Sequence, residues 1–297
     1  MQRPLRIGWI GTGVMGLPMV GHLMTAGHCL TVHSRTKSRA APLLDRGAQW
    51  AATPGDAAAE MDAVFSMVSL PTDVESVHLG PAGTLSCENP PQLLVDMTSS
   101  RPAIAREIAR AAEARGVYAL DAPVTGGDVG ARNATLSILV GGEESAFQRA
   151  MPLLSLLGKT IILQGGPGAG QQAKVVNQIL IAANMMGVCE GLLYARESGL
   201  DPAKVLESVT VGAAGSWSLM NLAPRILKGD FEPGFFIEHF LKDLRIAIEE
   251  CRASNLDLPA LALAERLYER AHSAGHGRKG TQALYRLYEA GFQTTQS

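Results

Sequence analysis

The stretch RIGWIGTGVMG, residues 6–16, decides the fold class of the first half of the chain. Its first five residues, Arg6–Ile10, form a short apolar run typical of a buried strand. The pattern GxGxxG follows at once: Gly11 permits a tight turn, Gly13 lets the backbone approach a pyrophosphate, and Gly16 allows close packing of helix on strand. An apolar helical pattern comes next. The glycine pattern alone is weak evidence, but between a strand and a helix it predicts a dinucleotide-binding unit of the Rossmann type.

Short apolar runs continue to alternate with longer helical patterns as far as residue 164. The further strands predicted from these runs are Leu30–His33, Ala63–Val68, Leu93–Asp96, Tyr118–Asp121, Leu136–Val140 and Thr160–Leu163. This alternation is the βαβ signature of a parallel sheet, and the continuous apolar character of the early runs fits a sheet covered by helices on both faces. The pairing of the last two runs is left open.

The chain changes character after a cluster of glycines and one proline at residues 165–170. The elements predicted beyond it are helices: Ala169–Ser198 closed by Gly199, a helix starting at Pro202 with Asp201 as N-cap, then Trp217–Lys228, Ile237–Ser254, Pro259–Ala274 and Gly280–Ala290. We therefore predict an α/β protein with two domains. Residues 1–165 form a Rossmann-like dinucleotide-binding domain, and residues 166–297 form a C-terminal all-α domain.

One of these helices carries an expectation about assembly. Val175–Leu193 is apolar around much of its circumference, so the helix must be buried on several sides. A small second domain offers limited cover, and a second subunit can provide the rest. We expect a homodimer or homotetramer, with packing between the two domains alone as the alternative.

Composition excludes several classes of protein. The 297 residues are 46% hydrophobic and 18% charged, which fits neither a disordered nor a fibrous chain, and a net charge of −2 indicates neither nucleic acid nor a membrane as partner. The longest apolar stretch, Ile179–Val188, falls short of the roughly 20 residues that a membrane span needs. With no signal peptide expected before the first strand, the predicted location is cytoplasmic.

We interpret the scattered Cys29, Cys87, Cys189 and Cys251 as reduced, buried thiols, and we expect no metal site.

The segment at the end of the second predicted strand bears on the choice of cofactor. NAD-binding proteins commonly place Asp or Glu there for the ribose 2′-hydroxyl, whereas this chain reads HSRTK at His33–Lys37. Arg35 can bind a 2′-phosphate in a bidentate manner, assisted by the hydroxyls of Ser34 and Thr36. The segment therefore predicts NADP(H), with NAD(H) less favoured. The alternative is a solvated basic loop that binds nothing.

Two residues near the start of the long apolar helix are candidates for chemistry. Lys174 and Asn177 are three positions apart, so their side chains share one helix face. A cationic lysine is disfavoured on an apolar helix near its positive end, which suits Lys174 to proton transfer. Taken alone, Lys174 would more often be a lysine whose amine reaches solvent at a domain edge.

The run Asp121–Gly127, reading DAPVTGG, follows a predicted strand directly, at the edge where ligands of parallel sheets gather. Its glycine pair, Gly126 and Gly127, exposes backbone N–H groups able to hold a carboxylate, and Thr125 adds a hydroxyl donor. Taken alone, this run would more often be an ordinary turn.

Four blocks in order make the chain resemble the β-hydroxyacid dehydrogenase family, which includes 3-hydroxyisobutyrate dehydrogenase, tartronate semialdehyde reductase and glyoxylate/succinic semialdehyde reductase. The blocks are Ile10–Leu23, Asp121–Gly127 continuing to Thr135–Gly142, Gly168–Gln178 and Phe240–Leu244. The resemblance covers nearly the whole chain. It implies hydride transfer between NADP(H) and a small carboxylate-bearing substrate, interconverting a 3-hydroxy acid and its semialdehyde or keto acid.

The resemblance also implies roles for individual residues. Lys174 would be the catalytic acid/base, and the implied substrate contacts are Thr125, Gly126, Gly127, Asn177 and Lys242. Together with the residues argued above, the expected cofactor contacts are Gly11, Thr12, Gly13, Val14, Met15, Gly16, Ser34, Arg35, Thr36, Leu70, Pro71, Glu75, Thr98, Ser99 and Lys242.

Departures from the family pattern leave the substrate open. Thr125 stands where many members have Ser, and Gln178 stands where the hydroxyisobutyrate enzymes usually have Asn.

Two other functions are alternatives to the dehydrogenase. One is an imine reductase, which usually lacks a lysine at the position of Lys174, and the other is a non-catalytic NADPH-binding or interaction module.

Overall fold

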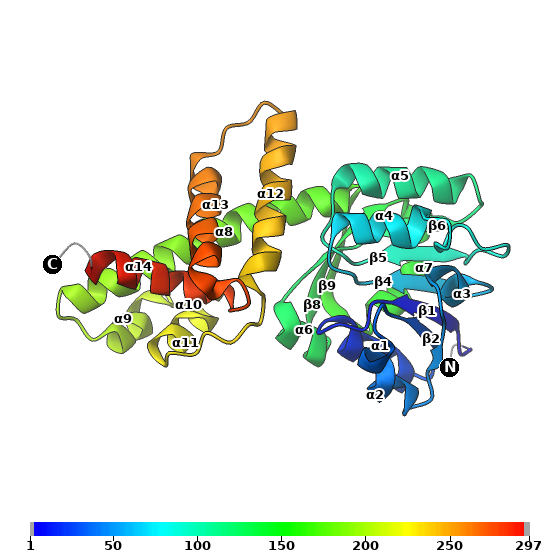
Figure 1. Cartoon of the computed structure of the whole chain (residues 1–297), viewed down its shortest axis with the longest axis horizontal. Helices are drawn as coiled ribbons and strands as arrows, with labels where there is room; N and C mark the ends of the chain where they lie inside the picture. The colour runs from blue at the N-terminus through cyan, green and yellow to red at the C-terminus, as the bar shows by residue number, and fades with distance from the viewer. Residues whose placement is uncertain (1–2, 294–297) are drawn as a thin grey trace. The chain divides into compact units, whose positions relative to one another are not determined.

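The computed structural model describes residues 3–293 and divides the chain into two compact units, Met1–Lys174 and Val175–Ser297 (Figure 1). The division falls within helix α8, Ala169–Glu197, which contributes its first turns to one unit and the rest to the other. Each unit has a hydrophobic core of its own. The predicted fold class, a Rossmann-like domain followed by an all-helical domain, is confirmed.

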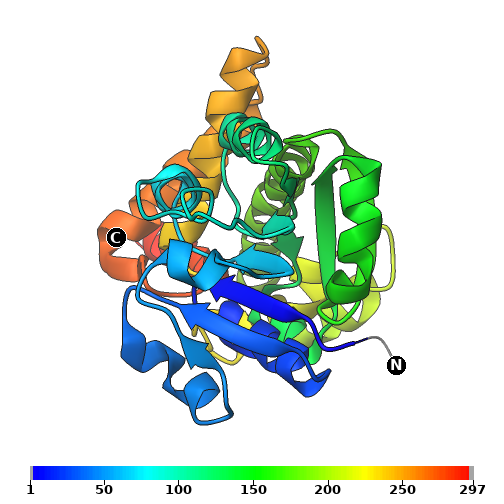
Figure 2. The ribbon, with the colours of Figure 1, turned by 90° about the vertical axis from the view of Figure 1, so that its right-hand side faces the viewer.

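The first unit is built on a sheet that has nine strands within the described residues, in the order β3-β2-β1-β4-β5-β6-β8-β7, with β9 beside β8. The strands are β1 Arg6–Ile10, β2 Cys29–His33, β3 Gln49–Trp50, β4 Ala63–Ser66, β5 Leu93–Asp96, β6 Tyr118–Asp121, β7 Val124–Thr125, β8 Leu136–Gly142 and β9 Gly158–Gly165. The six strands from β3 to β6 in that order are parallel (Figure 2). Strand β8 is antiparallel to β6 and β7 and parallel to β9, which answers the pairing left open above.

All seven predicted strands are present, with ends displaced by at most two residues. The sequence did not predict β3 and β7, because strands of two residues contain too few positions to show an apolar run or an alternation. The strand order reverses between β1 and β4. In open α/β sheets this switch point, at the carboxyl ends of the strands, is where ligands bind.

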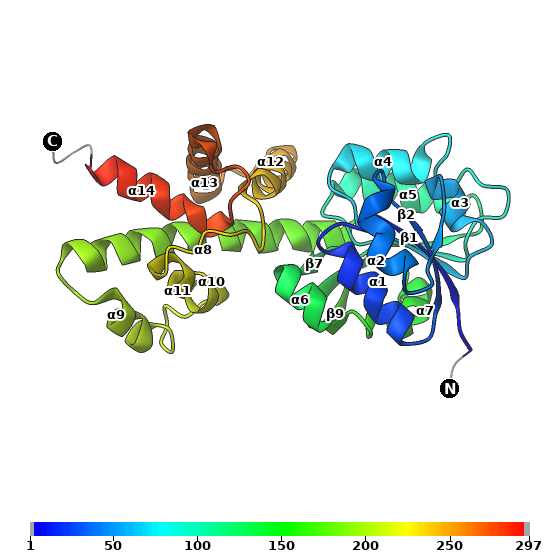
Figure 3. The same cartoon turned by 60° about the horizontal axis from the view of Figure 1, so that its bottom comes forward.

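Helices cover both faces of the sheet. The helices of this unit are α1 Gly16–Thr25, α2 Ala41–Leu44, α3 Pro54–Ala58, α4 Pro71–Leu79, α5 Pro102–Glu113, α6 Gly127–Asn133 and α7 Glu144–Leu154. Helices α1, α2, α6 and α7 share one core with the sheet, through residues such as Met19 and Leu154. Helices α3, α4 and α5 pack on the opposite face, through Ala57, Val74 and Ile108 (Figure 3).

The second unit is helical throughout its described regular elements. Beyond α8 it contains α9 Pro202–Val209, α10 Trp217–Asn221, α11 Ala223–Leu227, α12 Ile237–Ala253, α13 Pro259–Ala271 and α14 Leu284–Gln293. Its core joins α8, α12 and α13, and the rings of Phe240 and Tyr268 meet edge to face at 4.9 Å. As predicted, Asp201 caps α9 and Pro202 is its first residue.

Some predicted helix bounds were wrong. The single helix expected over Trp217–Lys228 is two short helices, because Pro224 has no N–H to donate and its ring clashes with a carbonyl four residues earlier. The helix expected to reach Ala274 ends three residues earlier, in a wide turn that includes Gly275. A 3-10 turn precedes α14, which therefore begins later than the predicted Gly280.

Helix α8 is less buried than its composition suggested. Ala182, Met185 and Cys189 lie in the core of the second unit, as expected for an apolar helix. Val176 and Leu180, however, are 57% and 61% exposed. One chain alone leaves part of α8 uncovered, so the expected burial on several sides and the expected homodimer or homotetramer stay predictions.

Helix α8 also corrects the expectation that no apolar stretch reaches membrane-spanning length. By length and composition alone this 29-residue helix could cross a membrane, since one 18-residue window has a mean hydropathy of 1.4, and 39% of that window is buried. Core helices of soluble proteins meet the same two criteria. The positions of α8 that pack in the helical core account for much of this apolar character.

The cysteines are all free, but they are not all buried. Cys189 and Cys251 are buried, whereas Cys87 is half-buried and Cys29 is exposed, so the interpretation was wrong for these two. Cys29 begins β2, whose side chains alternate between the two faces, and it falls on the outward side of that alternation.

A buried polar chain crosses the first unit beneath the carboxyl end of the sheet. The hydroxyl of Ser66 donates to Asp96 at 2.7 Å and lies 2.9 Å from Nε2 of His78, whose Nδ1 lies 2.9 Å from the hydroxyl of Thr84. Since the single Ser66 proton goes to Asp96, His78 donates from Nε2 and accepts at Nδ1. Burial lowers the pKa of His78 to about 3 and raises the pKa of Asp96 to about 6.

We predict that His78 makes the fold sensitive to acid. In the unfolded chain this histidine takes up a proton near pH 6.5, whereas in the fold it stays neutral down to about pH 3, so its contribution to stability is lost as pH falls through that window. Between pH 7 and pH 5 the wild type should lose about 2 kcal/mol more unfolding free energy than His78→Gln. Urea unfolding at both pH values measures this, with the exposed His272→Gln as control. Equal losses in wild type and His78→Gln would contradict the assignment.

Candidate active site

The glycine loop after β1 lies at the switch point of the sheet. A Cβ added to Gly16 would meet the carbonyl oxygen of Gly11 at 1.9 Å, and one added to Gly11 would meet the carbonyl oxygen of Met67 at 2.2 Å. These two glycines are therefore required by the protein's own packing. Gly13 differs, because a Cβ there would meet no described atom within 4 Å. The space beside Gly13 leaves the backbone open to approach by a ligand.

The same loop has further properties that fit a dinucleotide phosphate. Helix α1 begins directly after it, with no side-chain cap from Met15, so the positive end of the helix dipole is turned toward the loop. Thr12 is buried, and its hydroxyl has no hydrogen-bond partner among residues 3–293. An uncapped helix and a buried hydroxyl are the groups that a bound phosphate satisfies.

The segment His33–Lys37, which is predicted to determine the preference for NADP(H), lies at the end of β2. The guanidinium of Arg35 is 77% exposed and pairs with Asp73 at 3.3 Å, while Ser34 is half-buried and Thr36 exposed. The amine of Lys37 lies 5.6 Å from the ring centre of Trp50. Trp50 was not among the predicted residues, since it belongs to the short β3. Its ring adds an apolar wall beside this basic segment.

The remaining predicted cofactor residues lie at the carboxyl ends of β4 and β5. Leu70 is exposed at the start of α4, Pro71 is buried as its first residue, and Glu75 is exposed one turn later. Thr98 is buried, and its hydroxyl accepts from the N–H of Val68 at 3.0 Å. That bond ties the loop after β5 to the loop after β4.

Lys174 is buried, and its position is defined by hydrogen bonding. Its side chain is 8% exposed, and Nζ donates to the carbonyl oxygen of Val124 at 2.9 Å. Val124 lies in DAPVTGG, so the structure brings the two informative segments of the sequence together. The alternative interpretation, an amine that reaches solvent, does not fit this burial.

The glycine pair of the same run needs glycine for its backbone. Gly126 has φ 123° and Gly127 has φ 62°, both in the region that other residues rarely adopt. Gly126 precedes the seven-residue helix α6, and the neighbouring Thr125 is half-buried in β7, paired with Ser137 of β8. The turn is therefore fixed next to the carbonyl group that holds Lys174.

The second unit contains a polar chain around the other predicted substrate residues. Asn177 donates to Gln178 at 2.7 Å, and Gln178 donates to Asp243 at 2.6 Å. Lys242 pairs with the same carboxylate at 3.0 Å. Gln178 and Asp243 are buried and were not among the predicted site residues. Buried polar side chains on apolar helix faces were the signal that could have found them.

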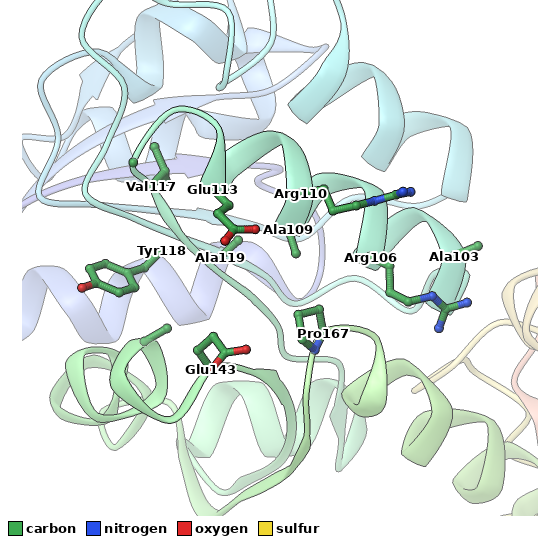
Figure 4. A pocket seen from close by; sticks show the side chains of 12 residues that line it. Ala103, Arg106, Ala109, Arg110, Glu113, Val117, Tyr118, Ala119, Glu143 and Pro167 are labelled. Atoms are coloured by element: carbon green, nitrogen blue, oxygen red, sulfur yellow. The ribbon is translucent and has the colours of Figure 1, made fainter.

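A separate hollow lies elsewhere in the first unit. It has a volume of about 780 Å³ and is lined by residues of α5, of β6 and the turn before it, of the start of α7 and of the segment before α8 (Figure 4). Arg106, Arg110, Glu113 and Glu143 place charges of both signs around it. None of the predicted site residues lines it, so this hollow is not the candidate active site.

Comparison with known proteins gives matches along both units. Residues 6–166 match the family model described as the NAD binding domain of 6-phosphogluconate dehydrogenase. Residues 168–288 match the model described as NAD-binding of NADP-dependent 3-hydroxyisobutyrate dehydrogenase.

Individual relatives agree with these models. The probable 3-hydroxyisobutyrate dehydrogenase-like 1, mitochondrial, of Arabidopsis thaliana is 50% identical, over 94% of this chain and 84% of the relative. The 2-hydroxy-3-oxopropionate reductase of Escherichia coli is 39% identical, over 96% and 97%. A solved structure of 3-hydroxyisobutyrate dehydrogenase from Mycobacterium tuberculosis with L-serine has a TM-score of 0.87 and 29% identity, over 96% of this chain and 99% of that one.

Two glycines of the loop should respond differently to alanine. In Gly13→Ala the new methyl group meets open space, so the thermal midpoint should change little while dinucleotide affinity falls at least about tenfold, because the methyl group stands where the phosphate approaches. In Gly16→Ala the methyl group meets backbone, so unfolding free energy should fall by roughly 1–3 kcal/mol. Thermal unfolding and titration with NADPH measure both. Unchanged affinity in Gly13→Ala would contradict the assignment of this loop.

Proposed function

The chain belongs to the β-hydroxyacid dehydrogenase family, and from this premise we propose that it is an NADP(H)-dependent dehydrogenase or reductase. In this proposal it interconverts a small 3-hydroxy acid and its semialdehyde or keto acid, with Lys174 as acid/base. The observation that carries the proposal is the buried amine of Lys174, bonded to the carbonyl group of Val124.

That arrangement suits proton transfer to a substrate oxygen. An ammonium group has three donors, and the Val124 bond uses one of them to orient Nζ. When bound, the nicotinamide supplies or accepts the hydride. Lys174 donates a proton as negative charge develops on the substrate oxygen during reduction, and it accepts that proton during oxidation. The burial of the amine removes water from competition for the same oxygen.

The expected substrate carries a carboxylate next to the reacting carbon chain. Backbone N–H groups at Gly126 and Gly127 and the hydroxyl of Thr125 form the proposed carboxylate-binding turn. Asn177 and Lys242 are proposed as further substrate contacts, with Lys242 also touching the cofactor. Relatives named 2-hydroxy-3-oxopropionate reductase and 3-hydroxyisobutyrate dehydrogenase support a small hydroxy acid or semialdehyde.

The preference for NADP(H) is part of the proposal and depends on Arg35. No carboxylate follows β2 within His33–Lys37, and the exposed guanidinium can turn toward a 2′-phosphate. Asp73 now pairs with Arg35, so a 2′-phosphate must compete with this carboxylate for the guanidinium. An exposed ion pair of this kind is weak, whereas a bidentate bond to phosphate is strong.

Lys174→Met should abolish nearly all turnover, because it keeps most of the side-chain volume and removes the proton donor. We expect kcat with NADPH and a panel of small aldehyde acids to fall at least about a thousandfold, within the range for general acids. NADPH affinity, measured by fluorescence titration, should stay within about twofold, since the amine is proposed to act on the substrate. The exposed Lys159→Met on β9 serves as control. Normal turnover by Lys174→Met would overturn the proposal.

Arg35→Ala should separate the two cofactors. Loss of a charge-assisted bond to the 2′-phosphate should raise the Kd for NADPH by about tenfold or more, while the Kd for NADH stays nearly constant. Arg39→Ala removes an exposed arginine from the same segment and should change neither value. If Arg35→Ala weakened both cofactors equally, or neither, the predicted NADP(H) preference would lose its basis.

A further inference from the structure

A buried carboxylate holds the N-terminal end of α8. Asp121, the last residue of β6, accepts from the backbone N–H of Gly168 at 2.7 Å and of Gln171 at 2.8 Å. Its side chain is 4% exposed, so these bonds are shielded from water. Burial raises the pKa of this carboxyl group, and the N–H groups of Gly168 and Gln171 oppose that rise. The carboxylate thus satisfies backbone donors that a buried helix start would otherwise leave without acceptors.

Two glycines, Gly141 and Gly170, leave the space that the Asp121 carboxylate occupies. A Cβ added to Gly141 would meet one Asp121 oxygen at 2.5 Å, and a Cβ added to Gly170 would meet the other at 2.8 Å. The two glycines belong to β8 and α8, the segments that border the carboxylate. Any side chain at either position would displace the carboxylate or the helix.

Gln171 adds a second attachment in the same turn. It is 1% exposed, its amide nitrogen donates to the carbonyl oxygen of Thr98 at 2.7 Å, and its amide oxygen accepts from the N–H of Ser100 at 2.8 Å. Both amide atoms therefore bind one loop, the loop after β5 that holds the predicted cofactor residue Thr98. A single side chain links this loop to the helix that carries Lys174.

Each attachment lies three residues before one partner of the bond between Lys174 and Val124. Gln171 lies three residues before Lys174 on α8, and Asp121 lies three residues before Val124, the acceptor for Lys174. The segment from Asp121 to Val124 thus binds the start of α8 at two levels: its carboxylate binds backbone N–H groups, and its last carbonyl binds the amine. Bonds at these two levels fix the position of α8 along its own axis and its rotation about that axis.

We propose that Asp121 and Gln171 are positioning residues for the catalytic step, which set the place of the Lys174 amine relative to the 125–127 turn and the loop after β5. This inference rests on the proposed function, in which Lys174 is the acid/base. The two residues act through Lys174 and contact neither substrate nor cofactor. A displacement of about 1 Å of a reacting group can cost on the order of a hundredfold in rate, so the attachments control turnover without touching the reaction.

Isosteric variants test the two attachments separately. Asp121→Asn places an amide NH₂ against one of the two backbone donors, and Gln171→Glu places a carboxylate oxygen against the carbonyl oxygen of Thr98. Each should lower kcat with NADPH and a small aldehyde acid by roughly 10- to 100-fold, with NADPH affinity within about threefold of wild type. Asp201→Asn makes the same substitution at the exposed N-cap of α9, away from Lys174 in sequence, and should leave kcat unchanged. If one variant fails to fold, the other carries the test, because the two bonds belong to different side chains.

A double-mutant cycle distinguishes positioning from general structural damage. Each substitution is repeated in Lys174→Met, and the residual rate is measured at high enzyme concentration. A residue that acts only through Lys174 should lower kcat in the wild type and cause no further loss in Lys174→Met. Equal losses in both backgrounds, a parallel loss of NADPH affinity, or wild-type kcat in both single variants would overturn the inference. Full turnover by Lys174→Met would instead overturn the proposed function, and this result does not depend on the Asp121 and Gln171 variants.

Discussion

The attachment of α8 to the sheet depends on one buried carboxylate. A helix start leaves backbone N–H groups without intrahelical acceptors, and burying such groups unpaired is costly. Asp121 supplies acceptors to Gly168 and Gln171, and the same bonds stabilise its own buried charge. Neither group could be buried here without the other. The carboxylate fits because Gly141 and Gly170 have no side chains, so three segments distant in sequence, at Asp121, at Gly141 and at residues 168–171, satisfy a single steric and electrostatic condition.

Much of the fold could be predicted because its signals are local. Strands of four or more residues appear as apolar runs, and the loop at Gly11–Gly16 has a recognisable sequence because the close backbone contacts of Gly11 and Gly16 admit only glycine. What could not be predicted depends on partners far along the chain. Strand β3 exists because Trp50 pairs beside Val32, and β8 runs antiparallel to β6 because of pairing that no run of its own residues encodes. The break in the helix at Pro224 could have been predicted, since proline disrupts a helix interior. The apolar periodicity around it instead suggested one continuous helix.

The residues of the candidate site also divide into those that a local sequence pattern reveals and those that depend on distant partners. Lys174, Thr125 and the glycine pair stand in motifs short enough to notice in the sequence. Gln171 and Asp243 also stand in sequence blocks named above, Gly168–Gln178 and Phe240–Leu244, yet their importance comes from hydrogen bonds to residues about 70 positions away. A polar residue in an apolar pattern indicates that a partner must exist, because an unpaired buried polar group is costly, but it does not say which partner. Partner identity is the part of the site that needed the three-dimensional structure.

Lys174 and Lys242, each within its own unit, have amines held by different kinds of contact. The amine of Lys242 pairs with the buried carboxylate of Asp243 at 3.0 Å. The amine of Lys174 donates to the carbonyl oxygen of Val124, and this bond fixes the direction of Nζ. A proton donor must be aimed at the oxygen that receives the proton, so a fixed direction is what the role proposed for Lys174 requires. The role proposed for Lys242, which is to bind a negative charge, depends less on direction, because the attraction between charges acts over a longer range than a hydrogen bond.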